Sequence, residues 1–117
     1  MSKLVLYALL LGNILLLSGG QIVWKNALSN MSGGLTISNV LTSPGVYIGG
    51  FMYVIATGLW FVILNNMKLS VAYPLQSFAY VIGIFSAWLV FGENIPLTRW
   101  IGGAVILVGV FLISLKS

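Results

Sequence analysis

The chain contains no cysteine and no histidine, and Glu93 is the only acidic residue among its 117 residues. The absence of cysteine excludes disulfides and metal sites built on thiolates. The absence of histidine removes the commonest general base and metal ligand. One acid without these partners leaves no catalytic constellation, so we expect neither an enzyme nor a metal or cofactor site.

Charge of either sign is scarce. Charged residues make up 5% of the chain and hydrophobic residues 60%, whereas a soluble domain carries about 25% charged residues. The five basic residues are scattered, at Lys3, Lys25, Lys68, Arg99 and Lys116. Because they form no basic patch, we expect no nucleic-acid partner. The composition is that of a membrane protein.

Four long apolar segments predict four transmembrane helices in one domain spanning residues 1–117. The expected helices cover residues 4–28, 44–64, 69–92 and 97–115. Helices of these lengths can cross a hydrocarbon core of about 30 Å, because each residue adds about 1.5 Å. The expected fold is an all-α membrane protein without a soluble domain. Its longest loop, between the first two spans, should lie partly at the membrane surface.

A polar stripe runs along the third span. With about 100° of rotation per residue, four hydroxyl side chains share one arc of the helix and Gln76 lies at its edge. The four are Ser70, Tyr73, Ser77 and Tyr80. Lipid cannot satisfy hydroxyl groups, so the stripe should face other helices or a wet cavity. It either makes hydrogen bonds between helices or lines a transport pathway.

Pro74 lies inside this stripe. Proline removes one backbone hydrogen bond and crowds the carbonyl of Ser70, so we expect a bend near Ser70. A bent helix with a polar stripe suits a hinge beside a pathway.

The first span carries polar residues toward its far end. Gln21 and Lys25 lie one turn apart, and Asn13 lies within about 120° of Lys25 on the helical wheel. A lysine at this depth has two interpretations. It can extend to the interface as an anchor, or turn inward with Gln21 and hold an anionic group.

The last span carries Gly102 and Gly109, seven residues apart and therefore on one face. Such a face admits another helix at close range, so we expect it at a dimer interface. Four spans place both termini on one side of the membrane. Three lysines, including Lys116, fall on that side against two basic residues on the other, which favours cytoplasmic termini by a small margin.

The chain resembles the small multidrug resistance family and the wider drug/metabolite transporter superfamily. The resemblance covers the whole chain and is strongest at Val71-Ala72-Tyr73, at Phe91-Gly92, and at Gly20 with Lys25. Drug exporters of that family have a glutamate in the first helix where this chain has Leu17. The departure argues against proton-coupled export of cationic drugs.

Within the superfamily, the chain looks most like flippase subunits for aminoarabinose-phosphoundecaprenol. Gly20-Gln21 followed by Lys25 matches their GQ-x-x-x-K pattern, and Ala72-Tyr73-Pro74 with Ser77 matches A-Y-P-x-x-S. Glu93, Trp100 and Gly102 also match. The resemblance implies a dimer, of one chain or with a paralogue, that translocates an anionic polyprenyl-phosphate lipid or lipid-linked sugar across the cell inner membrane.

The chemistry of the residues agrees with the resemblance. Lys25 and Gln21 offer a charge and hydrogen-bond donors to a lipid phosphate, and the hydroxyl stripe offers bonds to the head group. Asn13 and Gln76 are further candidate binding residues. A resting pair of Lys25 with Glu93, which the anionic head group displaces, is a hypothesis: Glu93 is the only acid and lies on the same predicted side. Two other functions stay open. One is a drug or small-molecule exporter with different coupling, and the other is a non-transporting accessory subunit of a larger membrane complex.

Overall fold

The computed structural model of the protein describes residues 2–115, which contain helices and no strand. The helices are α1 (Lys3–Ser29), α2 (Ile37–Thr42), α3 (Pro44–Asn66), α4 (Leu69–Gln76), α5 (Phe78–Leu89) and α6 (Leu97–Ser114). Because α4 and α5 are parts of one span, the chain has four helices long and apolar enough to cross a membrane. The prediction of an all-α protein with four spans is confirmed.

The helix ends have local causes. The Ser2 side chain caps α1 by accepting a hydrogen bond from the Val5 amide at 3.3 Å. Pro44 is the first residue of α3, where its missing N–H costs nothing. The third span ends at Leu89, three residues before the expected end at 92, and Gly92 has a φ of 64°. That left-handed conformation suits glycine and turns the chain toward α6.

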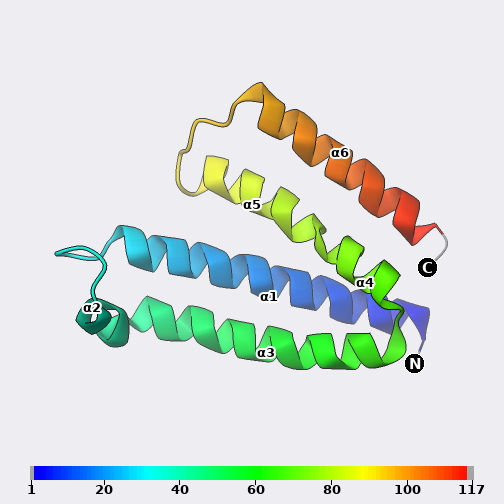
Figure 1. Ribbon diagram of the computed structural model, residues 1–117, viewed down its shortest axis with the longest axis horizontal. Helices are drawn as coiled ribbons and strands as arrows, with labels where there is room; N and C mark the ends of the chain where they lie inside the picture. The colour runs from blue at the N-terminus through cyan, green and yellow to red at the C-terminus, as the bar shows by residue number, and fades with distance from the viewer. Residues whose placement is uncertain (1, 116–117) are drawn as a thin grey trace.

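The spans form a staggered row in the order α3, α1, α4–α5, α6 (Figure 1). α1 packs against α3 on one side and against α5 on the other, and α6 packs against α4 and α5. The molecule measures 50 × 35 × 17 Å, so it is thin across the row. Both ends of the described chain lie on the same side of the row, at the right in Figure 1.

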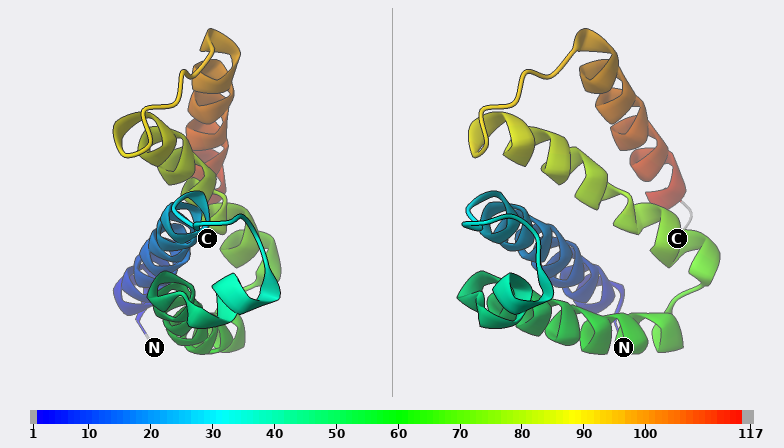
Figure 2. Two further views of the ribbon diagram at one scale, coloured as in Figure 1. Left: turned by 90° about the vertical axis from the view of Figure 1, so that its left-hand side faces the viewer. Right: turned by 60° about the vertical axis from the view of Figure 1, so that its left-hand side comes forward.

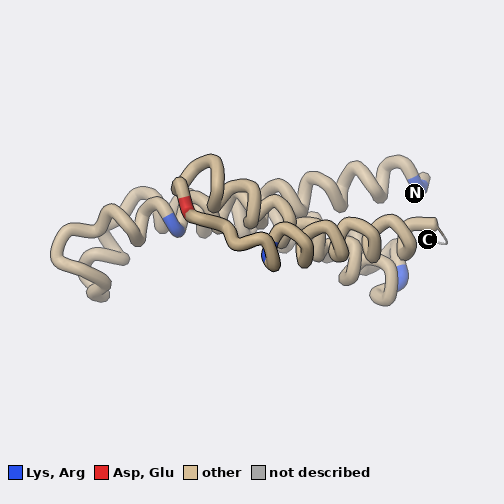
Figure 3. The backbone as a smooth tube through the Cα atoms, turned by 90° about the horizontal axis from the view of Figure 1, so that it is seen from above, with Lys and Arg blue, Asp and Glu red and all other residues tan. Residues whose placement is uncertain are grey.

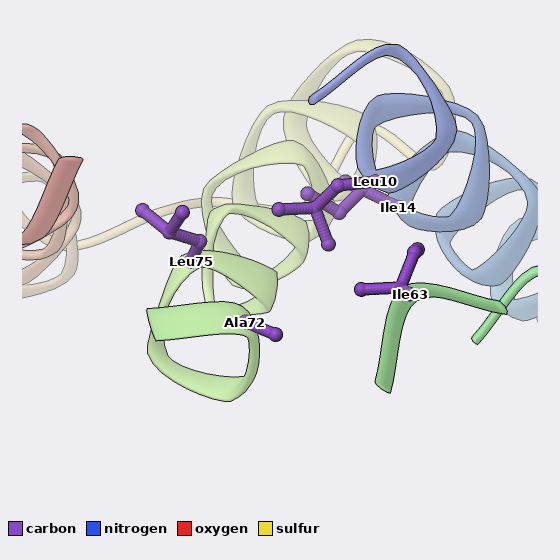
Figure 4. Close-up of a cluster of buried hydrophobic side chains, with 5 residues drawn as sticks. All are labelled: Leu10, Ile14, Ile63, Ala72 and Leu75. Carbon is purple, nitrogen blue, oxygen red and sulfur yellow. The ribbon is translucent and has the colours of Figure 1, made fainter. Parts of the chain in front are cut away.

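The buried core lies where α1, α3 and α4 meet, toward the chain termini (Figure 4). It consists of Leu10, Ile14, Ile63, Ala72 and Leu75. This cluster fixes the start of the third span against the first two. Most other large apolar side chains are exposed, as expected for surfaces that face lipid or a second subunit.

Glycines allow α1 and α3 to pack closely. The ring of Tyr53 lies over Gly20, where an added Cβ would stand 2.8 Å from the ring. The ring of Trp24 occupies the equivalent place over Gly49. A larger residue at either position would collide with an aromatic ring, so this interface depends on small residues.

The glycines of α6 are different. An added Cβ at Gly102 or Gly109 would meet nothing within 4 Å. The glycine that faces α5 is Gly103, where a Cβ would stand 3.4 Å from Ile84 Cδ1. The expected dimer face is therefore open in a single chain, and its use by a partner stays a prediction.

The loop between the first two spans contains α2, which lies beside the end of α1 and the start of α3 (Figure 2). The Thr36 hydroxyl caps this short helix by accepting a hydrogen bond from the Asn39 amide at 3.1 Å. Its apolar side chains are exposed, with Ile37 80% and Leu41 60% accessible. The expectation that this segment lies at the membrane surface stays a prediction.

The few charged residues are spread along the molecule (Figure 3). Lys3 opens α1 and Lys68 precedes α4, both at the end with the chain termini. Lys25 near the end of α1, Glu93 and Arg99 lie toward the opposite end. Lys116 lies outside the described residues. The excess of basic residues on the side of the termini counts Lys116, so this excess and the orientation that it favours stay predictions.

Candidate functional site

Asn13 and Gln76 come together in the buried interior. Asn13 is 1% exposed. Its Nδ2 donates to the Ala56 carbonyl at 2.7 Å, and its Oδ1 accepts from Gln76 Nε2 at 2.8 Å. The two amides join α1, α3 and α4, and each gives the other the partner that hydrocarbon cannot supply. Two residues expected in the site are thus neighbours.

The third span is interrupted at Ser77 rather than bent near Ser70. The Ser77 amide donates to the Pro74 carbonyl at 3.0 Å, and the Ser77 hydroxyl donates to the same oxygen at 2.5 Å. The Tyr80 amide donates to the Ser77 carbonyl at 2.9 Å. These bonds span three residues, as in a 3₁₀ turn, so the helix tightens at Ser77, about two turns after Ser70. A functional hinge at Pro74 stays a prediction.

The hydroxyl stripe faces outward in the single chain. Tyr73 is 64% exposed and Tyr80 69% exposed. Ser70 is exposed as well. The ring of Tyr73 lies 6.4 Å from that of Trp60 on α3, in a tilted arrangement. The stripe is therefore not brought together with Asn13 or Lys25 within one subunit. Ser77 is half-buried and its hydroxyl is already bonded, so in a bilayer the other three hydroxyls need a partner helix or a polar ligand.

Gln21 has a partner that the sequence did not indicate. Its Nε2 donates to the Tyr53 hydroxyl on α3. The Tyr53 ring stacks on Trp24, with centroids 4.4 Å apart and planes at 12°. Trp24 Nε1 in turn donates to the Val46 carbonyl at 3.0 Å. The glycines opposite these rings indicate close packing of α1 on α3. The sequence of either helix does not determine the register between them, so the Gln21–Tyr53 contact could not be predicted.

Lys25 and Glu93 are both exposed. Lys25 follows Gln21 by one turn of α1, and Glu93 lies in the connection between α5 and α6. The Glu93 amide donates to the Ala87 carbonyl at 3.0 Å. Within residues 2–115 the two side chains form no ion pair. Their pairing stays a prediction for the assembled protein.

Two grooves mark the surface. The larger, of about 760 Å³, lies between the end of α1, α2 and the start of α3, and none of the expected site residues lines it. The smaller, of about 400 Å³, runs along α3 from Tyr53 to Phe61. The smaller groove therefore adjoins the Gln21–Tyr53 pair, whereas the larger one was not foreseen.

Comparison with known proteins places the chain in a family. A model of the EamA-like transporter family matches residues 2–115. A relative from Pseudomonas fluorescens is 33% identical over 112 residues, covering 93% of this chain and 96% of that protein. Relatives from Yersinia pestis and Yersinia pseudotuberculosis are 43% identical over 56 residues, 48% of this chain. The match spans about half of these Yersinia proteins, 49% of their length.

All three relatives are named "probable 4-amino-4-deoxy-L-arabinose-phosphoundecaprenol flippase subunit ArnE". No solved structure matches the chain. The resemblance to transporters of this superfamily, and to these flippase subunits in particular, is confirmed. With four apolar spans, the chain is a multi-pass membrane protein, and it belongs to the EamA-like transporter family.

Proposed function

We propose that the protein is a subunit of a membrane translocator for an anionic polyprenyl-phosphate lipid or a lipid-linked sugar. The observation that carries the proposal is the similarity, over 93% of this chain, to a relative named as a subunit of such a flippase. The interior chemistry of the spans supports it independently.

No carboxylate lies in the membrane-spanning helices. Glu93, the only acid in the sequence, lies in the α5–α6 connection. A cationic drug would find no counter-charge there, and proton exchange would find no titratable acid. The spans instead offer amides, hydroxyls and the Lys25 ammonium. These groups donate hydrogen bonds to phosphate oxygens, so they suit an anionic head group.

Lys25, Gln21 and Tyr53 form the phosphate-binding part of the proposed site. Lys25 and Gln21 share one face of α1, one turn apart. The Tyr53 hydroxyl accepts from Gln21, so its own proton remains available to donate to a phosphate oxygen. Donating to that oxygen while accepting from an amide strengthens both bonds. The apolar groove beside Tyr53 leaves room for the lipid tail on the bilayer side.

A second subunit completes the pathway in this proposal. The row is 17 Å thin, and a row of helices encloses no passage. The outward stripe, with Ser70, Tyr73, Ser77 and Tyr80, would then face the pathway between subunits. The word subunit in the relatives' names favours a paralogue as the partner over a second copy. We place the termini in the cytoplasm, on the side with more lysines.

The test is lipid translocation in proteoliposomes containing the protein with its partner. Lys25→Ala should abolish binding of undecaprenyl phosphate while leaving expression and subunit association intact. Lys25→Arg should retain part of the activity, because the charge remains and its geometry changes. Lys68→Ala, which removes a lysine before α4 on the opposite side of the molecule, is the matched control. Normal transport by Lys25→Ala would identify the lysine as an interfacial anchor and remove the phosphate site.

A further inference from the structure

The larger groove lies at the same end of the molecule as Lys25. Its wall is apolar and consists of Ile22, Val23 and Ala27 of α1, Ile48 of α3, and Val90, which follows α5. Its rim is polar and comes from α1, α2 and the segments that join α2 to its neighbours: Asn26, Asn30, Ser32, Asn39, Thr42 and Ser43. No charged side chain lines it. At about 760 Å³ it falls within the usual range of small-molecule sites, about 300–1,000 Å³.

The amides of the rim keep unused hydrogen-bonding atoms. Asn30 Nδ2 donates to Asn26 Oδ1 at 3.1 Å, which leaves the Asn26 amide protons and the Asn30 carbonyl oxygen free for a ligand. Asn39 Nδ2 donates to the carbonyls of Ser32 and Gly34, at 2.9 and 2.7 Å, and its own carbonyl oxygen makes no such bond. The rim therefore presents both donors and acceptors, held in place by bonds within the chain.

This combination selects a class of ligand. Uncharged amides and hydroxyls recognise groups that both donate and accept, as sugar hydroxyls do. The apolar wall suits the C–H face of a sugar ring. A phosphate or carboxylate would find no cation in the groove, and a purely apolar chain would leave the free amide atoms unpaired.

We propose that the groove is a sugar-binding subsite that receives the sugar of a lipid-linked sugar while Lys25 holds its phosphate. The inference rests on the proposed function and adds the part of the head group that distinguishes one carrier lipid from another. α1 supplies both parts. Gln21 and Lys25 occupy one face of the helix, and Ile22 and Asn26 occupy the adjacent face, about 100° around it. A phosphate and the sugar bonded to it would thus lie on neighbouring faces of one helix end.

The experiment compares the affinities of two lipids for the protein with its partner in nanodiscs. The probes are the methyl phosphodiester of undecaprenol and the phosphodiester of the same lipid with L-arabinose, an uncharged sugar, so both carry one negative charge; each is measured by native mass spectrometry. The ratio of the two affinities isolates the sugar contribution. The wild-type protein should prefer the sugar-linked lipid about tenfold, the range expected of one or two hydrogen bonds. This ratio should change little with salt, because no charged side chain lines the groove.

Asn26→Leu combined with Asn30→Leu should bring the ratio close to one, because leucine has the size of asparagine without its polar atoms. Ile48→Trp, which fills the groove without removing an amide, should have the same effect. Asn66→Leu is the matched control, since Asn66 is an exposed amide that bonds a carbonyl one turn back, at 2.9 Å, at the other end of the row. It should leave the ratio unchanged.

Each outcome decides a different question. A wild-type ratio of one, or a ratio unchanged in the Asn26/Asn30 and Ile48 variants, overturns the sugar subsite and leaves the proposed function standing. Failure of the wild-type protein to bind either lipid defeats the proposed function and the subsite with it. Free L-arabinose at millimolar concentration, added as a competitor of the sugar-linked lipid, tests whether the groove recognises the ring itself. Competition lost in the double asparagine variant supports recognition of the ring itself, and competition equal in both proteins places the sugar elsewhere.

Discussion

The glycines between α1 and α3 are covered by neighbouring side chains, whereas Gly102 and Gly109 of α6 are open. Between α1 and α3, aromatic rings of the facing helix occupy the space beside Gly20 and Gly49. On α6, Gly102 and Gly109 face open space, and α6 is the least buried of the spans. Since both sets occur in similarly apolar helices, their spacing alone does not reveal whether the partner helix belongs to the same chain. The α1–α3 interface is complete in one subunit, and the α6 face is available to another.

The largest effect is expected where a glycine is already covered. Gly49→Leu should destroy the α1–α3 interface, because the new side chain would overlap Trp24, whose indole is fixed by its bond to the Val46 carbonyl. Overpacking of this kind costs about 1–3 kcal/mol or more. The measurement is the yield of monodisperse protein and its unfolding temperature in detergent. Gly50→Leu is the control, since a Cβ there meets nothing within 4 Å. Equal stability of the two variants would contradict the close packing.

Replacement of both Gly102 and Gly109 by leucine should separate the subunits and leave the single chain folded. The reason is that added side chains meet no atom of their own chain but would hold a partner helix away. Crosslinking yield in membranes measures association, and unfolding temperature measures the fold. Gly83→Leu, also in open space on α5, serves as the comparison. An unchanged crosslinking yield would mean that the α6 face has another use.

A smaller effect is expected at the junction between the two regions. Asn13→Leu and Gln76→Leu should each destabilise the protein. Gln76→Leu leaves Oδ1 of the buried Asn13 unpaired, and Asn13→Leu removes the partner of the half-buried Gln76 amide. Polar pairs in membrane helices contribute about 0.6–2 kcal/mol. A double-mutant cycle on unfolding free energy should therefore give a coupling in that range. Additive single effects would show that the contact carries no net stabilisation.

The smallest effect on stability is expected at Pro74. Pro74→Ala restores an amide that can donate to the Ser70 carbonyl, so α4 should gain regularity and the fold should change little. Lipid translocation should fall by more than stability does, if the interruption at Ser77 serves as a hinge. Parallel measurements of transport rate and unfolding temperature test this. Transport that stays at the wild-type rate would remove the hinge.

The spans could be predicted because hydrocarbon permits few structures. A charge-free window such as residues 69–92 must satisfy its own backbone, so a helix follows from composition. Its interruption at Ser77 could not be predicted from Pro74 alone, since it depends on two local bonds from Ser77 to the Pro74 carbonyl. The helical span follows from the absence of water in the hydrocarbon core. The interruption depends on a choice between two backbone geometries of nearly equal energy.

The candidate site could be predicted only in part, for a related reason. A helical wheel places Tyr73 and Tyr80 on one arc, but it does not say which way the arc points, and both are exposed. Likewise, the sequence marks Gln21 as polar within a span but not its partner Tyr53. The offset between α1 and α3 is set by how Trp24 and Tyr53 fit over the glycines. Residue types are local, whereas direction and register are properties of packing.

The tight α1–α3 interface also has a consequence for biosynthesis. These two spans are consecutive in the chain and their interface needs nothing from α6. Chains emerge from the ribosome N-terminus first, at about 5–20 residues per second. The first hairpin can therefore close in the membrane while the later spans are still being made. When α6 follows, it packs on α4 and α5, beside a hairpin that is already formed, and its open glycine face is ready for a newly made partner.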